Sequence, residues 1–305
     1  LAGQLSVAHQ LHKSSGDWVL NVTSDTDYIQ SNFRTIERLY RPEFNRDWNI
    51  ETLTSSQRLS DLGDQLFVRM GTQLAHTEKG ELKYQFQHLN FGDNYEGNRH
   101  LFFTKLNFDR FQLYSNSSLL QTAALFTNSM FYRSDNRLKY SYKKGWSGVN
   151  FSTEHNEKKQ VELDEFDPIS QKFQTYEVFT GLGDSTKVFV KLGYIHRVND
   201  SIQNNRLTKV NTSNTYYLDS KWIQTKNTNL SLYANYRNFK TTNTSSPSQK
   251  SVNSRLQYSQ KLANNGISWT TLFETNAGRL PQQDFTYIEV EPGQGTFVWF
   301  DYNEN

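Results

Sequence analysis

Apolar and polar residues alternate with a period of two through most of residues 187–262, and this pattern constrains the fold more than any other feature. In Lys187–Arg197, Val188 and Val190 fall on one parity and Lys191 on the other. Successive side chains of a β-strand point to opposite faces, whereas a helix repeats about every 3.6 residues, so the pattern predicts strands with one apolar and one polar face. The alternation recurs, with charges on one parity only, in Thr215–Gln224, Asn229–Phe239 and Ser251–Leu262.

The connections between these strands are expected to alternate in length. Tight turns are predicted at residues 183–185, 225–228 and 264–266, and long polar loops at 198–214 and 240–250. A meander of antiparallel strands with tight turns at one end and long loops at the other is the plan of an outer-membrane β-barrel. An antiparallel sandwich also alternates apolar and polar residues, and it stays open as the alternative.

The alternation is expected to begin at Gln65. The connections predicted in this part are a longer loop at 91–98, a turn or bulge at 109–110, a connection at 116–121, a tight turn at 134–136, one long bulged strand over 137–153 and a long loop at 154–172. We therefore predict an all-β, antiparallel up-and-down meander. It would be a transmembrane β-barrel, or part of one, of about 12–14 strands, each roughly nine to twelve residues long.

Three segments follow from this pattern. They are N-terminal strands and a connecting segment over residues 1–64, the barrel meander over 65–280, and a C-terminal hairpin over 281–305. Within the first segment, residues 30–64 are expected to form a loop or short helix. The reason is that Phe33–Leu39 has helix-like apolar spacing and is followed by a proline, which would stop a helix.

The two parities of the meander have different chemistry. Since Arg or Lys at the bilayer midplane costs about 2–4 kcal/mol, the charged parity is expected to face a hydrated lumen, with a solvated sheet face as the alternative. The lumen-facing candidates are Arg69, Lys83, Lys105, Arg133, Lys191, Lys221, Arg237, Arg255 and Glu274. The aromatic residues expected near strand ends, at the lipid interface, are Tyr194, Tyr216, Trp222, Tyr236, Tyr258, Trp269 and Phe273.

Composition excludes several functions. The net charge of +2 gives no reason to expect nucleic acid as a partner. The chain has no cysteine, which excludes disulfides, thiolate metal sites and cysteine nucleophiles. No apolar run is long enough for a spanning helix, so a membrane location would have to use strands. The histidines and the acidic residues near 162–167 form no metal-binding or catalytic pattern, and we predict that the protein is not an enzyme.

The C-terminal stretch carries part of a metal-binding pattern. Asp301, Asn303 and Asn305 alternate as oxygen ligands do at the start of a calcium loop, but the Gly and distal Glu of that loop do not follow. We predict calcium as the only cofactor to consider here, with a polar turn as the alternative.

Residues 285–305 (FTYIEVEPGQGTFVWFDYNEN) and Tyr40–Trp48 (YRPEFNRDW) resemble segments of very large, poorly characterised outer-membrane proteins of Bacteroidota. The resemblance covers about thirty residues, with a shared pattern E-x-G-x-G-x-[YF]-x-W-x-D-Y-N. It implies an outer-membrane location, reached by export, and a long β-rich chain, but no activity. Since the sequence stops inside the shared pattern, we expect further strands beyond this segment.

Three hypotheses about function remain. The first is an integral outer-membrane β-barrel with a role in transport, secretion or scaffolding, whose partners are outer-membrane lipid, other envelope proteins or the remainder of a longer chain. The second is a soluble extracellular or periplasmic β-sheet protein that binds glycan or protein through exposed aromatics such as Trp18, Trp146 and Trp299. The third is a lipid-carrying β-groove, lined by the apolar parity.

Overall fold

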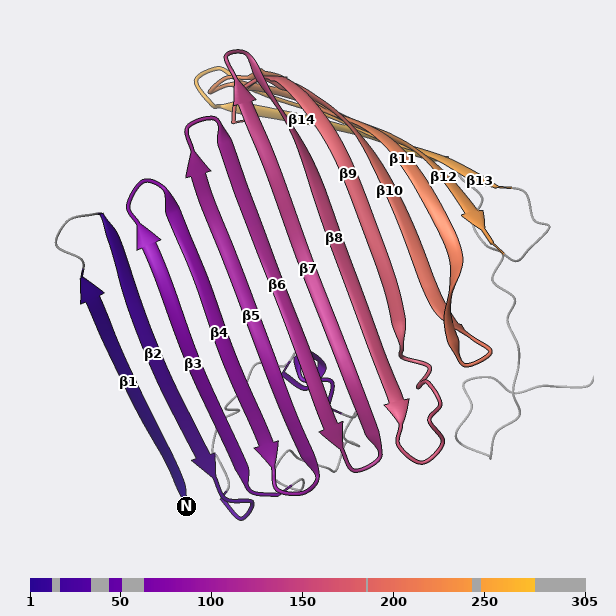
Figure 1. Cartoon of the computed structure of the whole chain (residues 1–305). Helices are drawn as coiled ribbons and strands as arrows, with labels where there is room; N and C mark the ends of the chain where they lie inside the picture. Colours follow the sequence, from indigo (N-terminus) through magenta and orange to yellow (C-terminus); the bar gives the residue numbers. More distant parts are fainter. Residues whose placement is uncertain (13–16, 34–43, 51–62, 185, 243–247, 278–305) are drawn as a thin grey trace, which may run out of the picture.

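The computed structural model describes residues 1–12, 17–33, 44–50, 63–184, 186–242 and 248–277. In this part of the chain, fourteen strands form one sheet whose spatial order is the sequence order, and every neighbouring pair is antiparallel (Figure 1). The prediction of an all-β, up-and-down antiparallel meander is confirmed.

The elements have the following bounds. They are β1 Ala2–His12, β2 Trp18–Ile29, α1 Phe44–Asp47, β3 Gln65–His76, β4 Gly80–Phe91, β5 Tyr95–Phe108, β6 Phe111–Ala124, β7 Thr127–Tyr142, β8 Gly145–Gln160, β9 Gln171–Gly183, β10 Phe189–Gln203, β11 Arg206–Gln224, β12 Thr228–Thr241, β13 Gln249–Leu262 and β14 Ile267–Ala277. Because β2 pairs directly with β3, the strands of the first 64 residues belong to the same sheet as the later ones.

The connections at one end of the sheet are short. This end, at the top of Figure 1, is named the tight-turn end, and its connections include residues 77–79, 109–110 and 143–144. The opposite end, named the loop end, carries the longest connections, at 30–64 and 161–170. The prediction of short turns at one end is therefore confirmed.

Several of the predicted connections are wrong, because strands continue through them. The expected loop at 91–98 is a short turn between β4 and β5, and 116–121 and 134–136 lie inside β6 and β7. The expected strand over 137–153 is divided by a turn at 143–144, and the expected loop over 154–172 begins only after β8.

The largest of these errors is the expected loop at 198–214. Strands β10 and β11 continue through it and turn at Asn204 and Asn205, which both have positive φ. Asparagine tolerates this conformation, and two such residues make the tight hairpin turn whose twist matches the strands. The flanking segments carry polar residues on both parities, with only Val198, Ile202, Leu207 and Val210 apolar, so the strict alternation that marks a strand is absent although the backbone pairing continues.

Residues directly opposite one another in neighbouring strands share a face, so the register defines two faces. On one, named the polar face, a row runs from Lys191 through Asp219, Tyr233 and Arg255 to Glu274. On the other, named the apolar face, a row runs from Val149 to Val178 and then through three tyrosines, Tyr194, Tyr216 and Tyr236.

The sheet bends across β9–β12 (Figure 1). Two glycines on the polar face of this region are covered by aromatic rings: Gly181 by Trp146 and Gly193 by Tyr217. A Cβ at either glycine would collide with the ring, so these positions let a large side chain lie flat across the neighbouring strand.

Candidate functional site

The apolar face is exposed rather than packed. Leu192 is 54% exposed, Val178 57% and Phe273 58%. Among the described residues, no element lies over this face, since α1 packs on the polar face and the strands contact their neighbours in the meander. In a soluble antiparallel sheet the apolar face is the one that packs on a core, so this arrangement needs another apolar partner.

Most exposed apolar residues of the strands form a band nearer the tight-turn end, while Phe126 and Leu163 are among those exposed in connections at the loop end. On β9 the apolar face carries Leu182 and Val178, and it changes to Gln174 and Lys172 toward the loop end. On β12 the change occurs after Tyr236, where Asn238 follows on the same face. The apolar face is therefore divided into an apolar band and a polar extension.

Two of the predicted interface aromatics border this band instead of lying at the strand ends. Tyr194 is well inside β10 and Tyr216 is near the middle of β11, with ring centroids 5.0 Å apart. The expectation about strand ends is wrong for these two, because their strands extend past the band. At the border, the Tyr194 hydroxyl donates to Asn214 Oδ1 at 2.7 Å, and His196 Nδ1 lies 2.8 Å from the same oxygen.

The remaining aromatics of the prediction also contribute to the apolar face. Tyr236, Tyr258, Trp269 and Phe273 lie on it by register. Trp222 occupies the irregular position between Lys221 and Ile223, near the tight-turn end, and is half exposed.

All nine residues predicted to line a lumen lie on the polar face, as the register shows. Six of them form ion pairs: four pair with carboxylates that the sequence did not single out, and Arg255 and Glu274 pair with each other. The ion pairs are Arg69–Asp27 at 2.9 Å, Lys83–Glu81 at 2.9 Å, Arg133–Asp47 at 3.3 Å, Lys191–Glu177 at 3.4 Å and Arg255–Glu274 at 3.2 Å. Of the other three, Arg237 lies over the Phe239 ring, 5.3 Å from its centroid, while Lys105 and Lys221 lie on the same face of β5 and β11.

Glu177 organises the most connected polar cluster on this face. Its carboxylate accepts hydrogen bonds from Asn150 Nδ2 at 2.5 Å, from Lys191 Nζ at 3.4 Å and from the Tyr217 hydroxyl. These donors lie on β8, β10 and β11, so one carboxylate on β9 connects four strands. With three donors around its carboxylate and only 16% of its side chain exposed, Glu177 stabilises the bent part of the sheet.

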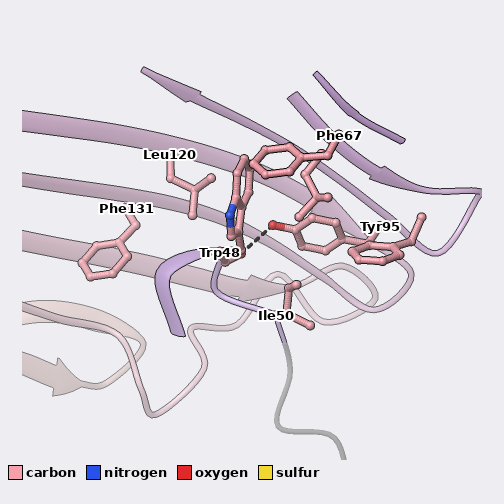
Figure 2. Packing of buried hydrophobic residues seen from close by; sticks show 8 residues of the cluster. Trp48, Ile50, Phe67, Tyr95, Leu120 and Phe131 are labelled. Atoms are coloured by element: carbon pink, nitrogen blue, oxygen red, sulfur yellow. Dashed lines mark hydrogen bonds between the residues drawn. The ribbon is translucent and has the colours of Figure 1, made fainter. Parts of the chain in front are cut away.

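The second feature of the polar face is the short segment around α1. Trp48 is 2% exposed and packs against Phe67, with ring centroids 5.5 Å apart (Figure 2). The Tyr95 hydroxyl donates to the backbone oxygen of Trp48 at 2.5 Å, and Gly97 leaves room for the indole. The buried residues of this cluster are Trp48, Ile50, Phe67, Leu89, Phe91, Tyr95, Leu120 and Phe131.

Polar contacts extend the attachment of this segment across the sheet. Asp47 pairs with Arg133 on β7, and Asn49 Nδ2 donates to Asn156 Oδ1 on β8 at 3.1 Å. Residues 44–50 of the connection between β2 and β3 are thus held against the polar face near the loop end, from β3 to β8. The prediction of a loop or short helix in residues 30–64 is confirmed for Phe44–Asp47. Apart from Phe33, the helix expected at Phe33–Leu39 lies outside the described residues.

Other predicted site residues are not brought together. Trp146 was expected to be exposed for ligand binding, but it is 6% exposed because it packs over Gly181, so that expectation is wrong. Trp18 is half buried against His76. Trp299, the C-terminal hairpin, and the calcium candidates Asp301, Asn303 and Asn305 lie outside the described residues.

Within the part of the chain that the structure describes, no three His, Cys, Asp or Glu side chains are grouped to hold a metal ion. No helix among the described residues has the length and apolarity to cross a membrane. Comparisons with protein-family models, with curated proteins and with solved structures find no match to the chain. The functional argument therefore depends on the two faces of the sheet.

Proposed function

We propose that this chain forms all or part of an integral outer-membrane β-barrel, with the apolar band against lipid and the polar face lining a hydrated interior. The observation that carries the proposal is the exposed apolar band, which excludes charge while the opposite face is densely ionised. A barrel strand in a bilayer requires this division, because its outward residues touch hydrocarbon and its inward residues touch water.

The size of the hydrophobic effect supports lipid over water as the partner of the apolar band. Apolar surface left in water costs about 25 cal/mol per Å², and the band spans most of the sheet. A soluble sandwich would cover this surface with a second sheet, but the described strands all belong to one sheet. The lipid-groove hypothesis would need the apolar face inside a trough along the sheet, whereas the hollow on this face, of about 560 Å³, is confined to β6–β10.

The register of the sheet also supports a cylinder of tilted strands. One row of paired residues starts at Ala277, the last residue of β14, and passes through Tyr216 and Leu113 to Trp18, the first residue of β2. This row therefore shifts along the strands by about the length of β14 as it crosses the sheet, from the loop end at β14 to the tight-turn end at β2. Closing a barrel requires such a stagger, since its strands tilt relative to the axis.

The polar face suggests what the interior does. Its charges have both signs and are mostly neutralised in pairs, so it provides a wet surface without a dedicated ionic ligand site. The anchored α1 segment occupies part of this face near the loop end. This arrangement fits transport, secretion or scaffolding through a hydrated interior partly filled by the protein's own connection.

The proposal is tested by expressing the chain with an export signal in a Gram-negative host. We expect it in the outer-membrane fraction, extracted only by detergent, with heat-modifiable migration in gels. A monodisperse protein that stays in solution without detergent would overturn the proposal. The second hypothesis, a soluble β-sheet protein, would then have to explain the exposed band by a partner protein.

A further inference from the structure

The apolar band is hollowed over β6–β10, near the tight-turn end. The hollow, named the apolar hollow, has a volume of about 560 Å³, within the range of about 300–1,000 Å³ that is typical of small-molecule pockets. One row of paired residues accounts for it, because the small side chains of Ser147 and Thr180 lie between the larger ones of Tyr140 and Leu192.

The apolar hollow has about the length of one lipid leaflet. On β10 its lining extends to Tyr194, which lies about 17 Å along the strand from Phe189, the first residue of β10. A strand tilt of about 35–45° reduces this length to a depth of about 12–14 Å. Half of a hydrocarbon core of about 30 Å is about 15 Å, so the hollow suits one acyl chain that lies along the strands.

Hydroxyl groups form the rim of the apolar hollow toward the turns. The Tyr142 hydroxyl lies 3.3 Å from Thr180 Oγ1, and Ser147 Oγ lies 2.9 Å from the same oxygen. The surface therefore changes from apolar to hydroxyl-bearing just before the strands end. A glycerophospholipid has the same order along its length, with acyl chains, then ester groups, then a charged phosphate.

Basic residues lie beyond these hydroxyls, in the β5–β6 and β7–β8 turns. A hydrogen bond between the Arg110 guanidinium and the side chain of Tyr140, which lines the hollow, raises the pKa of Arg110. Lys143 and Lys144 are exposed, and within the described part of the chain neither forms an ion pair. These three residues, Arg110, Lys143 and Lys144, are named the basic rim.

The carboxylates of the neighbouring turns do not cancel this charge. Each is matched by a basic residue of its own turn, since Asp109 lies 3.9 Å from Arg110 and Asp184 lies 3.9 Å from Lys187. The two lysines therefore set the net charge of the basic rim. At the opposite end of β8 and β9 the connection is acidic, so an anionic headgroup is favoured at the tight-turn end. The acidic residues there are Glu162, Asp164, Glu165 and Asp167.

We propose that the apolar hollow and the basic rim bind one anionic glycerophospholipid, with an acyl chain in the hollow and the phosphate at Arg110, Lys143 and Lys144. The inference rests on the proposed function, because a bilayer brings lipid to this face. It adds selectivity, since bulk lipid covers the apolar band whatever its headgroup, whereas basic side chains at a bilayer surface attract anionic lipids.

The test measures binding of radiolabelled phosphatidylglycerol and phosphatidylcholine to the full-length protein, purified in detergent from the membranes of its own cells. Lys143→Gln/Lys144→Gln removes the net charge of the basic rim. The matched control, Lys226→Gln/Lys261→Gln, removes the same charge at the same end of the sheet, beyond β9 and β10. This separation is about 14 Å at about 4.8 Å per strand, more than the Debye length of about 8 Å.

A second pair of variants tests the hollow. Val178→Trp fills it, and Val252→Trp adds the same ring to the apolar face outside it. Both variants keep the apolar face free of charge, so neither should change the detergent dependence of the protein.

We expect saturable binding of one phosphatidylglycerol and no saturable binding of phosphatidylcholine. At roughly fivefold for each lysine, Lys143→Gln/Lys144→Gln should weaken this binding about 30-fold. The lysine control should change it by less than about twofold, because its charges are screened from the basic rim. Val178→Trp should abolish the binding, and Val252→Trp should leave it unchanged.

Equal binding of the two lipids, or equal losses in the two lysine variants, would overturn the inference by reducing the basic rim to general charge attraction. Unchanged binding in Val178→Trp would overturn it by placing the acyl chain elsewhere. Loss of a copurifying protein from that variant would overturn it in favour of a protein partner. A protein that is monodisperse without detergent would refute the membrane proposal as well, whereas a detergent-dependent protein without lipid selectivity would refute only the lipid site.

Discussion

If the apolar band faces lipid as proposed, a charge placed within it should destabilise the protein. Leu256 lies on the apolar face of β13, between Leu232 and Phe273 of the neighbouring strands. Its neighbour in sequence, Gln257, lies on the polar face and is exposed. Leu256→Arg and Gln257→Arg therefore add the same side chain to opposite faces of one strand.

The free-energy cost of an arginine on the apolar face depends on whether that face contacts lipid, water or packed protein. Arginine at the bilayer midplane of a barrel costs about 2–4 kcal/mol, and the cost falls to about 0–1 kcal/mol near the interfaces. In water, a surface substitution changes stability by only about 0.5 kcal/mol. In a packed protein core, an unpaired buried charge costs more than about 4 kcal/mol. We expect Leu256→Arg to cost about 2–4 kcal/mol and Gln257→Arg less than about 0.5 kcal/mol.

A third variant tests whether the cost of an arginine falls toward the border of the apolar band, as it would toward the surface of a bilayer. Val252 lies in the same row as Tyr236 at the border of the band, so Val252→Arg should cost only about 0–1 kcal/mol. The assay is reversible unfolding in urea from lipid vesicles, followed by tryptophan fluorescence and by heat-modifiable migration. Equal, small effects of Leu256→Arg and Gln257→Arg would refute the assignment of the apolar band to lipid.

Three further predictions follow from the polar face and the β2–β3 connection. Trp48→Ala should weaken the attachment of the β2–β3 connection to the sheet by about 3–5 kcal/mol through lost packing. Limited proteolysis should then cut this connection faster than in the wild type. The control variant Phe44→Leu should increase the rate of cutting much less. Glu177→Gln should lower the unfolding free energy by about 2 kcal/mol through loss of its charged hydrogen bonds, measured in urea against the exposed control Glu78→Gln. The backbone N–H of Ser31 and then the Tyr28 hydroxyl lower the pKa of Asp64. The Asp64 carboxylate therefore stabilises the fold at pH values above its unfolded-state pKa of about 3.9, and this stabilisation is lost as the pH falls through the lower folded-state pKa. Hydrogen exchange near Ser31 should accelerate in that acid range, and Asp64→Asn should abolish the pH dependence.

The strands with strict alternation could be predicted because each of their two faces has a single environment, either apolar or polar. Of the predicted strand 187–197, residues 189–197 lie within β10, and 229–239 lie within β12; Lys191 and Arg237 lie on the expected face. The stretches that failed are rich in Ser, Asn and Thr. Cross-strand hydrogen bonds such as Ser117–Ser134 at 2.7 Å and Ser115–Asn136 at 2.6 Å stabilise those segments as strands without any apolar pattern.

The attachment of α1 was missed for a different reason, because it depends on residues that break the pattern. Phe67 and Leu89 pair with each other on the polar face, and Leu120 and Phe131 do so further along. Four large apolar residues on a charged parity cannot be stabilised by water, so they indicate a patch that needs an apolar partner. The sequence separates that partner, Trp48, from all of them, and only the register brings the patch together.

The same patch explains why one sheet can have an exposed apolar face and still contain a core. The apolar band is continuous and open, as a surface for hydrocarbon must be, whereas the patch on the polar face is small, local and covered by Trp48. The apolar band is hollowed over β6–β10, where Phe111, Val149 and Leu192 are among the residues that line a cavity of about 560 Å³. A fluid partner fills such a hollow without a matched shape, and the charge-free band with its bordering tyrosines meets the requirements of a hydrocarbon phase.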